Sequence, residues 1–340
     1  MSVKNIANAT QVAKLAGVSR SAVSRTFTPG ASVSAATRER VLKAAKELNY
    51  HVNHLARGLS NERSRPVCIL GADLKAPYQA SLLNAITKRL QEAGRAVMVI
   101  NSSGDQDSST DAIRQTLNYR ASATIVLSGT PPASLIETCL QAGQHVILVN
   151  REGQFEGPDH ITVNVQAAII EAYQLMAEAG CQHFAVVSST IQSPSLIKRE
   201  NVFIQAVKDS GRACELRRDG PTSYETGALS ARQLLSRDTP IDGVFCVTDL
   251  IACGFMDVAR HEFGLRIPED LCVLGFDNIE QAGWYGYQLT TFSQPLSEIA
   301  DAISELLESA LDNHRKAETR TFNAPLTWRN SIRHRKSTQR

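Results

Sequence analysis

The most constraining feature of this sequence is a pair of short helical patterns that meet at a glycine near the N-terminus. Apolar residues recur at helical spacing between Val12 and Ala16. Gly17 ends that pattern, because glycine supplies the backbone freedom that a tight turn needs. Thr10 is predicted to cap the first helix with its hydroxyl group, and Ser19 is predicted to cap the second.

A third helical pattern follows these two. Ser34 is predicted to cap it, and Val41, Ala45 and Leu48 recur on one of its faces. Two short helices joined by a glycine turn and braced by a third are typical of a helix-turn-helix. A generic three-helix packing module would show the same pattern, so the charge of the region has to separate the two interpretations.

Charge is divided unevenly along the chain. Residues 1–65 contain 11 Lys and Arg against 3 Asp and Glu, a balance of +8. Residues 66–328 contain 20 against 31, a balance of −11, and residues 329–340 contain 5 against 0. A basic head on an acidic body favours contact between the head and nucleic-acid phosphates.

Two segments of the head carry a specific resemblance. GVSRSAVSR and VSAATRERVLKAAKELNYHVNHLARGLS resemble the DNA-binding head of the lac-repressor (LacI/GalR) family of bacterial transcription regulators. The resemblance implies a recognition helix that enters the major groove, where side chains read base edges. The DNA-binding residues that it implies are Thr10, Arg20, Ser21, Ala22, Ser24, Arg25, Asn53, His54 and Leu59.

The resemblance also implies a hinge helix that matches residues 53–60. Its leucine, here Leu59, would enter the minor groove and unstack a base step; the alternative is a linker residue that packs on the body. Gly58 lies inside this helix and costs about 1 kcal/mol relative to Ala. We therefore expect the hinge helix to form only when DNA and a partner hinge are present.

The rest of the chain alternates between apolar runs and amphipathic helical patterns. This alternation predicts βαβ units and parallel sheets that are covered on both faces. A second series begins at Ile161, so we expect two α/β lobes. The predicted strands are 67–70, 96–100, 123–127 and 146–149 in the first series, and 184–187, 214–216, 244–247 and 271–276 in the second.

Three further motifs extend the resemblance over most of the chain. VFCVTDLIACG, IPEDLCVLGFDN and LTTFSQP are similar to the family's regulatory core, which is shared with periplasmic sugar-binding proteins. The resulting domain prediction is a helix-turn-helix over 1–52, a hinge helix and linker over 53–65, and a bilobed periplasmic-binding-protein-like core over 66–330. Lobe one is predicted to span 66–160 and 292–323, lobe two 161–291 and 324–330, and a loose basic tail 331–340.

Polar residues at the ends of predicted strands suggest a pocket between the lobes, because ligands bind at the carboxyl ends of parallel strands. The effector-binding residues that the resemblance implies are Tyr78, Asn150, Ser195, Arg199, Thr248, Asp249 and Asp277. Asp, Asn and Arg with one aromatic face suit a sugar. The alternative for Arg199 and Asp277 is that they cap elements or pair with each other. Asn150 and Thr248 depart from the residues common in the family, which leaves the identity of the effector open.

Composition sets the remaining expectations. No apolar run reaches the roughly 20 residues that span a bilayer. The seven cysteines are scattered without a CxxC pair, which predicts reduced thiols in a cytoplasmic protein. No enzyme motif or paired-histidine metal motif is present, so we expect no catalytic residues, no metal site and no cofactor.

The function predicted from these features is that of a transcription regulator, a repressor controlled by a small-molecule effector of carbohydrate type. Two-fold symmetry in protein and DNA must match, so we expect a homodimer on a palindromic operator in double-stranded DNA. The C-terminal segment RNSIRHRKSTQR lacks apolar heptads, which favours a dimer over a tetramer. The alternatives are a cytosolic sugar-binding or sugar-modifying α/β protein without operator recognition, and a regulator that has lost its ligand response.

Overall fold

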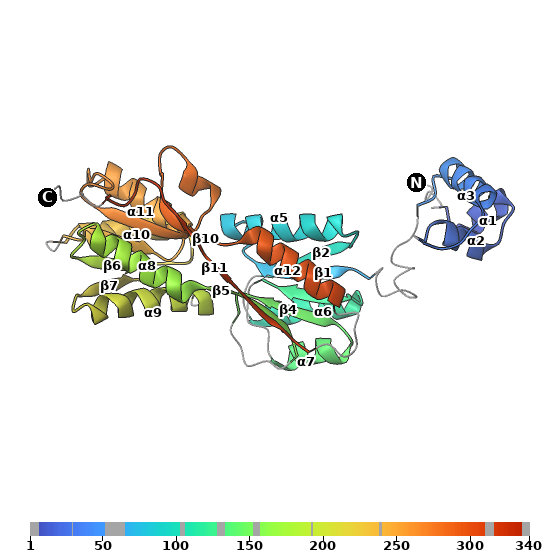
Figure 1. Cartoon of the computed structure of the whole chain (residues 1–340), viewed down its shortest axis with the longest axis horizontal. Coiled ribbons are helices and arrows are strands. Elements are labelled where there is room, and N and C mark those ends of the chain that lie inside the picture. Colours follow the sequence, from blue (N-terminus) through green and yellow to red (C-terminus); the bar gives the residue numbers. More distant parts are fainter. Residues whose placement is uncertain are drawn as a thin grey trace, which may run out of the picture. The chain divides into compact units, whose positions relative to one another are not determined.

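The computed structural model divides the chain into two compact units, Met1–Arg65 and Pro66–Arg340 (Figure 1). It describes residues 7–28, 30–51, 65–102, 106–127, 133–151, 157–191, 193–237, 240–309 and 316–334.

The first unit is a bundle of short helices around a small apolar core. Helix α1 spans Ala9–Ala16, α2 spans Arg20–Thr26 and α3 spans Ala35–Glu47. The core gathers Val12, Ala13, Ala16, Val23, Val41, Ala44 and Ala45. Gly17 ends α1 with φ 62°, in the left-handed region that glycine tolerates. The predicted caps of α2 and α3 are confirmed, since Ser19 accepts from the amide of Ala22 and Ser34 from that of Thr37.

The prediction that Thr10 caps the first helix was wrong. Helix α1 begins one residue earlier, and Asn8 caps it by accepting from the amides of Thr10 and Gln11 at 3.0 Å each. The Gln11 side chain returns a bond to the Asn8 amide at 2.8 Å and completes a capping box. The predicted hinge helix over 53–60, with Asn53, His54 and Leu59, lies outside the described residues.

The first lobe of the second unit is a parallel sheet in the order β11-β5-β4-β3-β1-β2. Side chains alternate between its faces: Val67 and Ile69 pack toward α5, while Cys68 and Leu70 pack toward α6 and α7. Figure 1 shows α5 and α12 lying together on one face. The strands are β1 Val67–Ala72, β2 Val97–Ser102, β3 Ala123–Val126, β4 His145–Val149, β5 Asp159–Asn164 and β11 Thr319–Asn323. The helices are α5 Pro77–Glu92, α6 Gln106–Asn118, α7 Ala133–Gln141 and α12 Leu296–Ser309.

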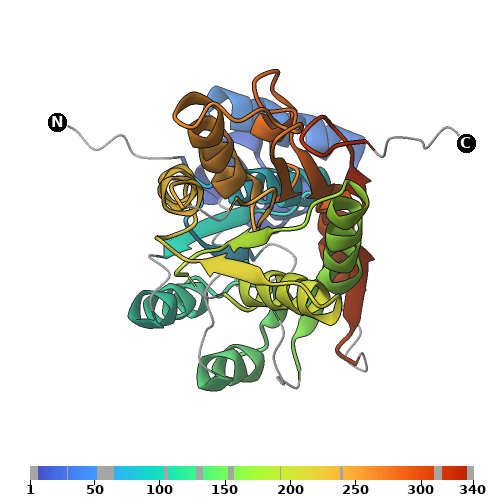
Figure 2. The ribbon, with the colours of Figure 1, turned by 90° about the vertical axis from the view of Figure 1, so that its left-hand side faces the viewer.

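The second lobe repeats this architecture in the order β12-β10-β9-β8-β6-β7, and only the β10–β12 pair is antiparallel among the described strands. Figure 2 shows its sheet with α8 and α9 on one side and α10 and α11 on the other. The strands are β6 Phe184–Val187, β7 Cys214–Arg217, β8 Gly243–Cys246, β9 Cys272–Asp277, β10 Thr290–Ser293 and β12 Leu326–Thr327. The helices are α8 Val165–Glu178, α9 Pro194–Asp209, α10 Tyr224–Leu235, α11 Asp249–His261 and the 3-10 turn η2 Glu280–Gly283.

Two predicted lobe boundaries need correction. Strand β5 continues to Asn164 and pairs with β4 and β11, so the first crossing follows residue 164 instead of 160. Strand β10 pairs with β9 up to Ser293, so the second crossing follows residue 293 instead of 291. In both cases the strand completes its sheet before the chain crosses to the other lobe.

The predicted loose tail also begins later than residue 331. Ser331 and Ile332 are fully buried. The Ser331 hydroxyl donates to the carbonyl of Val273 at 2.6 Å and accepts from the amide of Thr290 at 2.8 Å. Residues up to Arg333 are therefore part of lobe two, which a count of basic residues could not indicate.

The composition predicted reduced thiols and no membrane-spanning segment. All seven cysteines, each within the described residues, are free thiols, as predicted. Among the described helices, none combines the length and apolarity that a bilayer crossing requires.

Candidate functional site

Helix α2 of the first unit presents a polar, basic face to solvent. Arg20, Ser21, Ser24 and Arg25 are exposed, and Ala22 is half-buried. Val23 points the other way and is 1% exposed, which fixes the rotation of the helix on its core. The structure thus places the predicted base-reading residues on one side of one helix, and Thr10 is exposed on α1.

Hydrogen bonds hold α2 in place but leave its two arginine side chains, Arg20 and Arg25, exposed to solvent. The hydroxyls of Ser19 and Ser21 lie 2.9 Å apart, and Arg25 Nε donates to the Ser21 carbonyl at 3.5 Å. Arg38 of α3 donates to the carbonyl of Thr26 at 2.9 Å and ties α3 to the end of α2. The exposed cations of α2 remain available to phosphates and base edges.

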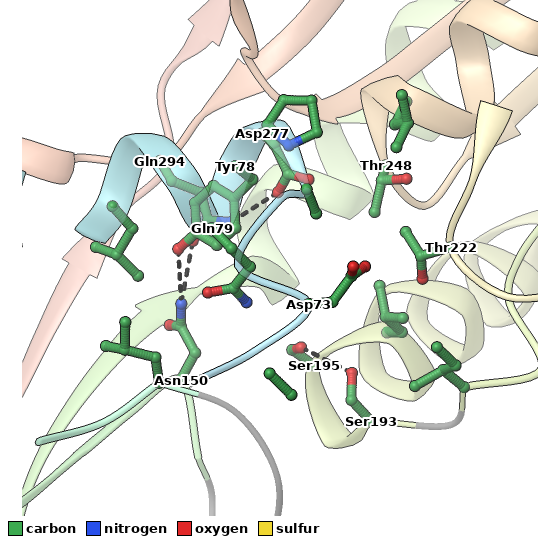
Figure 3. Close-up of a pocket in the computed structure, with 18 of the residues that line it drawn as sticks. Asp73, Tyr78, Gln79, Asn150, Ser193, Ser195, Thr222, Thr248, Asp277 and Gln294 are labelled. Carbon is green, nitrogen blue, oxygen red and sulfur yellow. Dashed lines mark hydrogen bonds between the residues drawn. The ribbon is translucent and has the colours of Figure 1, made fainter. Parts of the chain in front are cut away.

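The second unit contains a cavity of about 480 Å³ whose walls come from both lobes. Figure 3 shows Tyr78, Gln79 and Asn150 on one side and Thr222 and Thr248 on the other. Most of its polar residues follow the carboxyl ends of strands, as the topology of parallel sheets requires. The polar lining comprises Asp73, Tyr78, Gln79, Asn150, Arg151, Ser193, Ser195, Arg199, Thr222, Thr248, Asp277 and Gln294.

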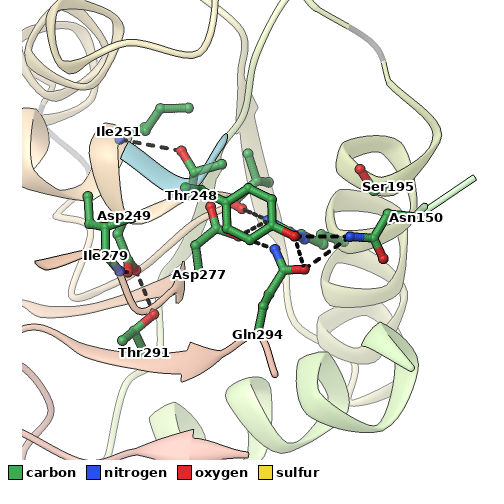
Figure 4. Close-up of polar contacts among 12 residues, drawn as sticks. Asn150, Ser195, Thr248, Asp249, Ile251, Asp277, Ile279, Thr291 and Gln294 are labelled. Atoms are coloured by element: carbon green, nitrogen blue, oxygen red, sulfur yellow. Dashed lines mark hydrogen bonds and ion pairs between the residues drawn. The ribbon is translucent and has the colours of Figure 1, made fainter. Parts of the chain in front are cut away.

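Besides Asp73 and Arg151, lobe one supplies three neutral polar side chains to this cavity. Tyr78 and Gln79 open α5, and Asn150 follows β4 with φ 53°, a left-handed conformation that asparagine tolerates. The Asn150 amide donates to the Tyr78 hydroxyl and to Gln294 Oε1 at 3.1 Å each, and Tyr78 donates to Gln294 Oε1 at 2.7 Å. Gln294 lies where the chain leaves β10 for lobe one, so this triangle of bonds joins both lobes at a crossing (Figure 4).

Lobe two supplies a buried ion pair. Arg199 of α9 donates to Asp277 Oδ1 at 3.1 Å and to the carbonyl of Val247 at 2.8 Å. Its guanidinium lies 3.8 Å from the centre of the Phe276 ring. Gln294 Nε2 donates to the same Asp277 oxygen at 2.6 Å. The predicted alternative, in which Arg199 pairs with Asp277, is confirmed. Both residues also line the cavity.

The backbone at Asp277 is unusual. Asp277 has φ 117° and Asn278 has φ 55°, both outside the regions that L-residues prefer. Arg329 Nη2 donates to Asn278 Oδ1 at 2.7 Å and Arg329 Nη1 donates to the carbonyl of Leu289 at 2.7 Å, which holds this turn in place. Such strain persists only where the surroundings enforce it, and it is concentrated at functional sites.

Asp249 does not line the cavity, which contradicts its prediction as an effector-binding residue. Thr248 caps α11 at the cavity wall, whereas the Asp249 carboxylate, 0% exposed, turns into the lobe. It accepts from the Thr291 hydroxyl at 2.6 Å and from the Ile279 amide at 2.9 Å (Figure 4). Its role in this structure is to hold the loop after β9 against β10.

Burial shifts the pKa values of three charged side chains in or next to the cavity. Desolvation raises the pKa of the Asp277 carboxyl, and the Arg199 guanidinium opposes that shift. Desolvation, with a smaller contribution from the Asp277 charge, raises the pKa of Asp249 to about 7. Desolvation lowers the pKa of Arg151, which ends up at about 10 and still protonated at neutral pH.

The structure brings Tyr78, Asn150, Ser195, Arg199, Thr248 and Asp277 together, as predicted from the sequence. The predicted effector-binding set did not include six further polar residues of the lining: Asp73, Gln79, Arg151, Ser193, Thr222 and Gln294. Asp73 directly follows β1 and Gln294 directly follows β10, so the rule that selected Asn150 could have found them. Gln79 and Thr222 carry no such signal.

Comparison with known proteins identifies a matching domain family in each of the two units. Residues 10–53 match the family model for bacterial regulatory proteins of the lacI family, and residues 173–332 match a periplasmic binding protein-like domain. Catabolite control protein A of Priestia megaterium is 27% identical over 302 residues, covering 87% of this chain and 90% of that protein.

Solved structures share the fold across nearly the whole chain. A crystal structure of the lac repressor dimer bound to operator and the anti-inducer ONPF aligns with a TM-score of 0.84 at 23% identity, covering 97% of this chain and 100% of that chain. A complex of the transcriptional regulator CelR with cellobiose aligns with a TM-score of 0.70 at 23% identity, covering 96% and 99%. The chain therefore combines a lacI-family domain over residues 10–53 with a periplasmic binding protein-like domain over residues 173–332.

Proposed function

We propose that this protein is a repressor that binds a palindromic operator as a homodimer and is controlled by a neutral sugar bound between its lobes. The observation that carries this proposal is a polar cavity built by both lobes in a chain that also presents a basic, exposed recognition helix. Two solved structures of similar fold support the same function: the lac repressor dimer bound to operator, and CelR in complex with cellobiose.

The charges of the cavity favour a neutral ligand. The lining contains two carboxylates, Asp73 and Asp277, and two guanidinium groups, Arg151 and Arg199, so its formal charges balance. A phosphorylated or carboxylated effector would upset that balance in a partly desolvated site, which is costly. A polyol brings no charge and offers many hydroxyl groups.

Unused hydrogen-bonding atoms support the same class. Arg199 Nε and Gln79 Oε1 are buried and lack a hydrogen-bond partner among the described residues. One is a donor and the other an acceptor, and a hydroxyl group can satisfy either. Buried polar atoms left unpaired are costly, so a ligand that pairs them gains affinity and specificity.

The interlobe triangle gives a route from the pocket to the rest of the molecule. Asn150, Tyr78 and Gln294 join the lobes at the edge of the cavity, so a ligand that competes for their bonds changes the preferred closure of the lobes. By linkage, an effector that alters DNA affinity by some factor has its own affinity altered by operator DNA by the same factor.

A ligand panel tests the effector half of the proposal. The full chain is scanned by thermal shift with neutral mono- and disaccharides, sugar phosphates and nucleosides. A ligand at 100 times its Kd stabilises the folded state by about 2.7 kcal/mol, a shift of several degrees. Asp277→Asn should abolish the shift, whereas Asp270→Asn, on the surface of the same lobe, should keep it. Stabilisation by sugar phosphates alone would contradict a neutral ligand.

A binding assay tests the DNA half. Upstream DNA of the protein's own gene is compared with scrambled DNA of equal length, by fluorescence anisotropy at two salt concentrations. Arg25→Ala should weaken specific binding by about 1–3 kcal/mol. Lys46→Ala, an equal loss of charge on α3, should leave the preference for the specific DNA intact. Equal affinity of the unsubstituted protein for both DNAs would contradict operator recognition.

A further inference from the structure

Two buried thiols meet in lobe two, at the end of β9 opposite Asp277. Cys181 precedes β6 and Cys272 is the first residue of β9. Both side chains are 0% exposed; Cys181 Sγ donates to the Asp242 carbonyl at 3.3 Å and Cys272 Sγ to the Pro268 carbonyl at 3.9 Å, and the thiols are near enough to shift each other's pKa. The effector site and the DNA-binding helix use neither of them, so the contact needs a separate explanation.

The intervening strand leaves room for this contact. Strand β8 lies between β6 and β9, and Gly243 of β8 is the register partner of Cys272. A Cβ atom at Gly243 would lie 3.0 Å from Cys181 Cβ and 3.3 Å from its Sγ. The absent side chain therefore lets Cys181 extend over β8 to the sulfur of Cys272.

A single arginine contacts both sulfurs. The backbone amide of Arg333 donates to Cys272 Sγ at 3.4 Å, and its Nη2 donates to Cys181 Sγ at 3.2 Å. Its other donors bind the carbonyls of Ala179 at 3.0 Å and Pro268 at 3.1 Å. Arg333 thus covers the pair and holds a positive charge against it.

This environment is that of a reactive thiol more than of an inert buried one. The neighbouring Cys181 thiol lowers the pKa of Cys272, and the amide and charge of Arg333 act in the same direction, against the desolvation that raises it. The buried pair of Cys68 and Cys139 in lobe one differs, because burial raises the pKa of both thiols there.

We propose that Cys181 and Cys272 form a reversible thiol–disulfide site that responds to hydroperoxides, with Arg333 as its cover. Disulfides in proteins of reducing compartments are typically transient and serve redox sensing. The proposal rests on the contacts of these three residues and is independent of the effector that the pocket binds.

The reaction balances with a hydroperoxide as oxidant. The Cys272 thiolate attacks the distal peroxide oxygen, the O–O bond breaks, and the alkoxide or hydroxide leaves with a proton as alcohol or water. The resulting Cys272 sulfenic acid is attacked by the sulfur of Cys181. The S–S bond forms, and the hydroxyl group leaves as water with the thiol proton. A dithiol reductant restores both thiols by exchange.

Access requires only a local movement. Arg333 is partly exposed, while Cys181 and Cys272 lie directly beneath it. Lifting this side chain breaks a few bonds to surface carbonyls and leaves the sheet intact. Openings of this size occur in folded proteins at low free-energy cost.

The test is a graded oxidation of the full chain with hydrogen peroxide, followed by peptide mapping and a count of free thiols. The expected result is a Cys181–Cys272 cross-link, with two of seven thiols lost, no change in circular dichroism, and full recovery with dithiothreitol. In Cys181→Ala, dimedone should trap a sulfenic acid on Cys272. Cys139→Ala is the matched control and should form the cross-link at the unsubstituted rate.

Three results would overturn the proposal. The first is a Cys68–Cys139 cross-link, or oxidation of half-buried Cys214, at a dose that leaves Cys181 and Cys272 intact. The second is sulfinic acid on Cys272 in the unsubstituted protein, since Cys181 would then fail to resolve the sulfenic acid. The third is complete resistance of the pair at a dose that oxidises free glutathione fully.

Discussion

The two lobes of the core are wound identically and differ in what they bring to the pocket. From one edge the strand order is β2-β1-β3-β4-β5-β11 in lobe one and β7-β6-β8-β9-β10-β12 in lobe two. The sixth strand is parallel to its neighbour in lobe one (β11) and antiparallel in lobe two (β12). Topology alone would therefore place ligand groups at equivalent positions of both sheets.

The chemistry at those positions is different. After β4, lobe one presents the neutral amide of Asn150, whereas β9 of lobe two ends in Asp277, paired with Arg199. Lobe two also buries a second carboxylate, Asp249, directly behind the first. Both lobes bring one carboxylate and one guanidinium to the cavity, Asp73 and Arg151 from lobe one and Asp277 and Arg199 from lobe two, and in lobe two these groups are joined by a hydrogen bond of 3.1 Å.

The largest expected effect comes from breaking the ion pair of lobe two. Asp277→Ala leaves Arg199 buried without its carboxylate and should lower the free energy of unfolding by about 3–5 kcal/mol. Asp277→Asn should cost much less, because its Oδ1 can still accept from both Arg199 and Gln294. Urea unfolding followed by tryptophan fluorescence measures this, since both tryptophans, Trp284 and Trp328, belong to lobe two. Both variants remove the carboxylate charge, so equal losses would contradict a contribution from the hydrogen bonds that Asn keeps with Arg199 and Gln294.

A smaller effect should follow from adding a methyl group between helices α10 and α11. A Cβ atom at Gly254 would lie 1.9 Å from the Tyr224 carbonyl oxygen, so the helices must separate, at a cost of about 3 kcal/mol. In lobe one a Cβ atom at Gly71 would meet the flexible end of Leu74 at 2.5 Å, and Gly71→Ala should cost about 1 kcal/mol or less. The same unfolding assay, read by circular dichroism, compares the two. A greater loss for Gly71→Ala would reverse the comparison.

The buried Asp249 predicts a pH dependence. Its pKa is raised in the folded state to about 7, so between its unfolded pKa and pH 7 the folded state binds more protons than the unfolded state. The contribution of Asp249 to stability is therefore complete at low pH and falls as the pH rises through about 7. Asp249→Asn, which can still accept from Ile279 and donate to Thr291, should flatten the profile between pH 5 and 8. An unchanged slope in this variant would show that Asp249 ionises freely.

Sequence reasoning found the features that depend on local pattern. The alternation of strands and helices, the glycine turn at Gly17 and the caps at Ser19 and Ser34 are set by neighbouring residues, and they were predicted. The ends of strands led to Asn150, Thr248 and Asp277 for the same reason. Arg199, Tyr78 and Ser195 came from family resemblance, because α5 and α9 show only an amphipathic pattern.

The sequence predictions were wrong where contacts between residues far apart in the sequence determine the structure. Thr248 and Asp249 are adjacent, but one caps α11 at the cavity and the other begins the helix turned toward Thr291, which lies far away in the sequence. Nothing in an apolar run tells which sheet it joins, so the boundaries near β5 and β10 were misplaced. A basic segment looked loose, although Ser331 is bonded to Val273 of β9.

The smallest expected effect concerns the neutral side of the pocket in lobe one. Asn150→Gly removes two shared hydrogen bonds but keeps the freedom that φ 53° requires, so it should cost about 1 kcal/mol. Asn150→Ala removes the same bonds and adds left-handed strain of about 1 kcal/mol. Both losses, read as free energies of unfolding by circular dichroism, should stay below that of Asp277→Ala, because Asn150 bonds only the neutral side chains of Tyr78 and Gln294. If Asn150→Gly were as damaging as Asp277→Ala, the triangle with Tyr78 and Gln294 would stabilise the fold as much as the buried ion pair of lobe two.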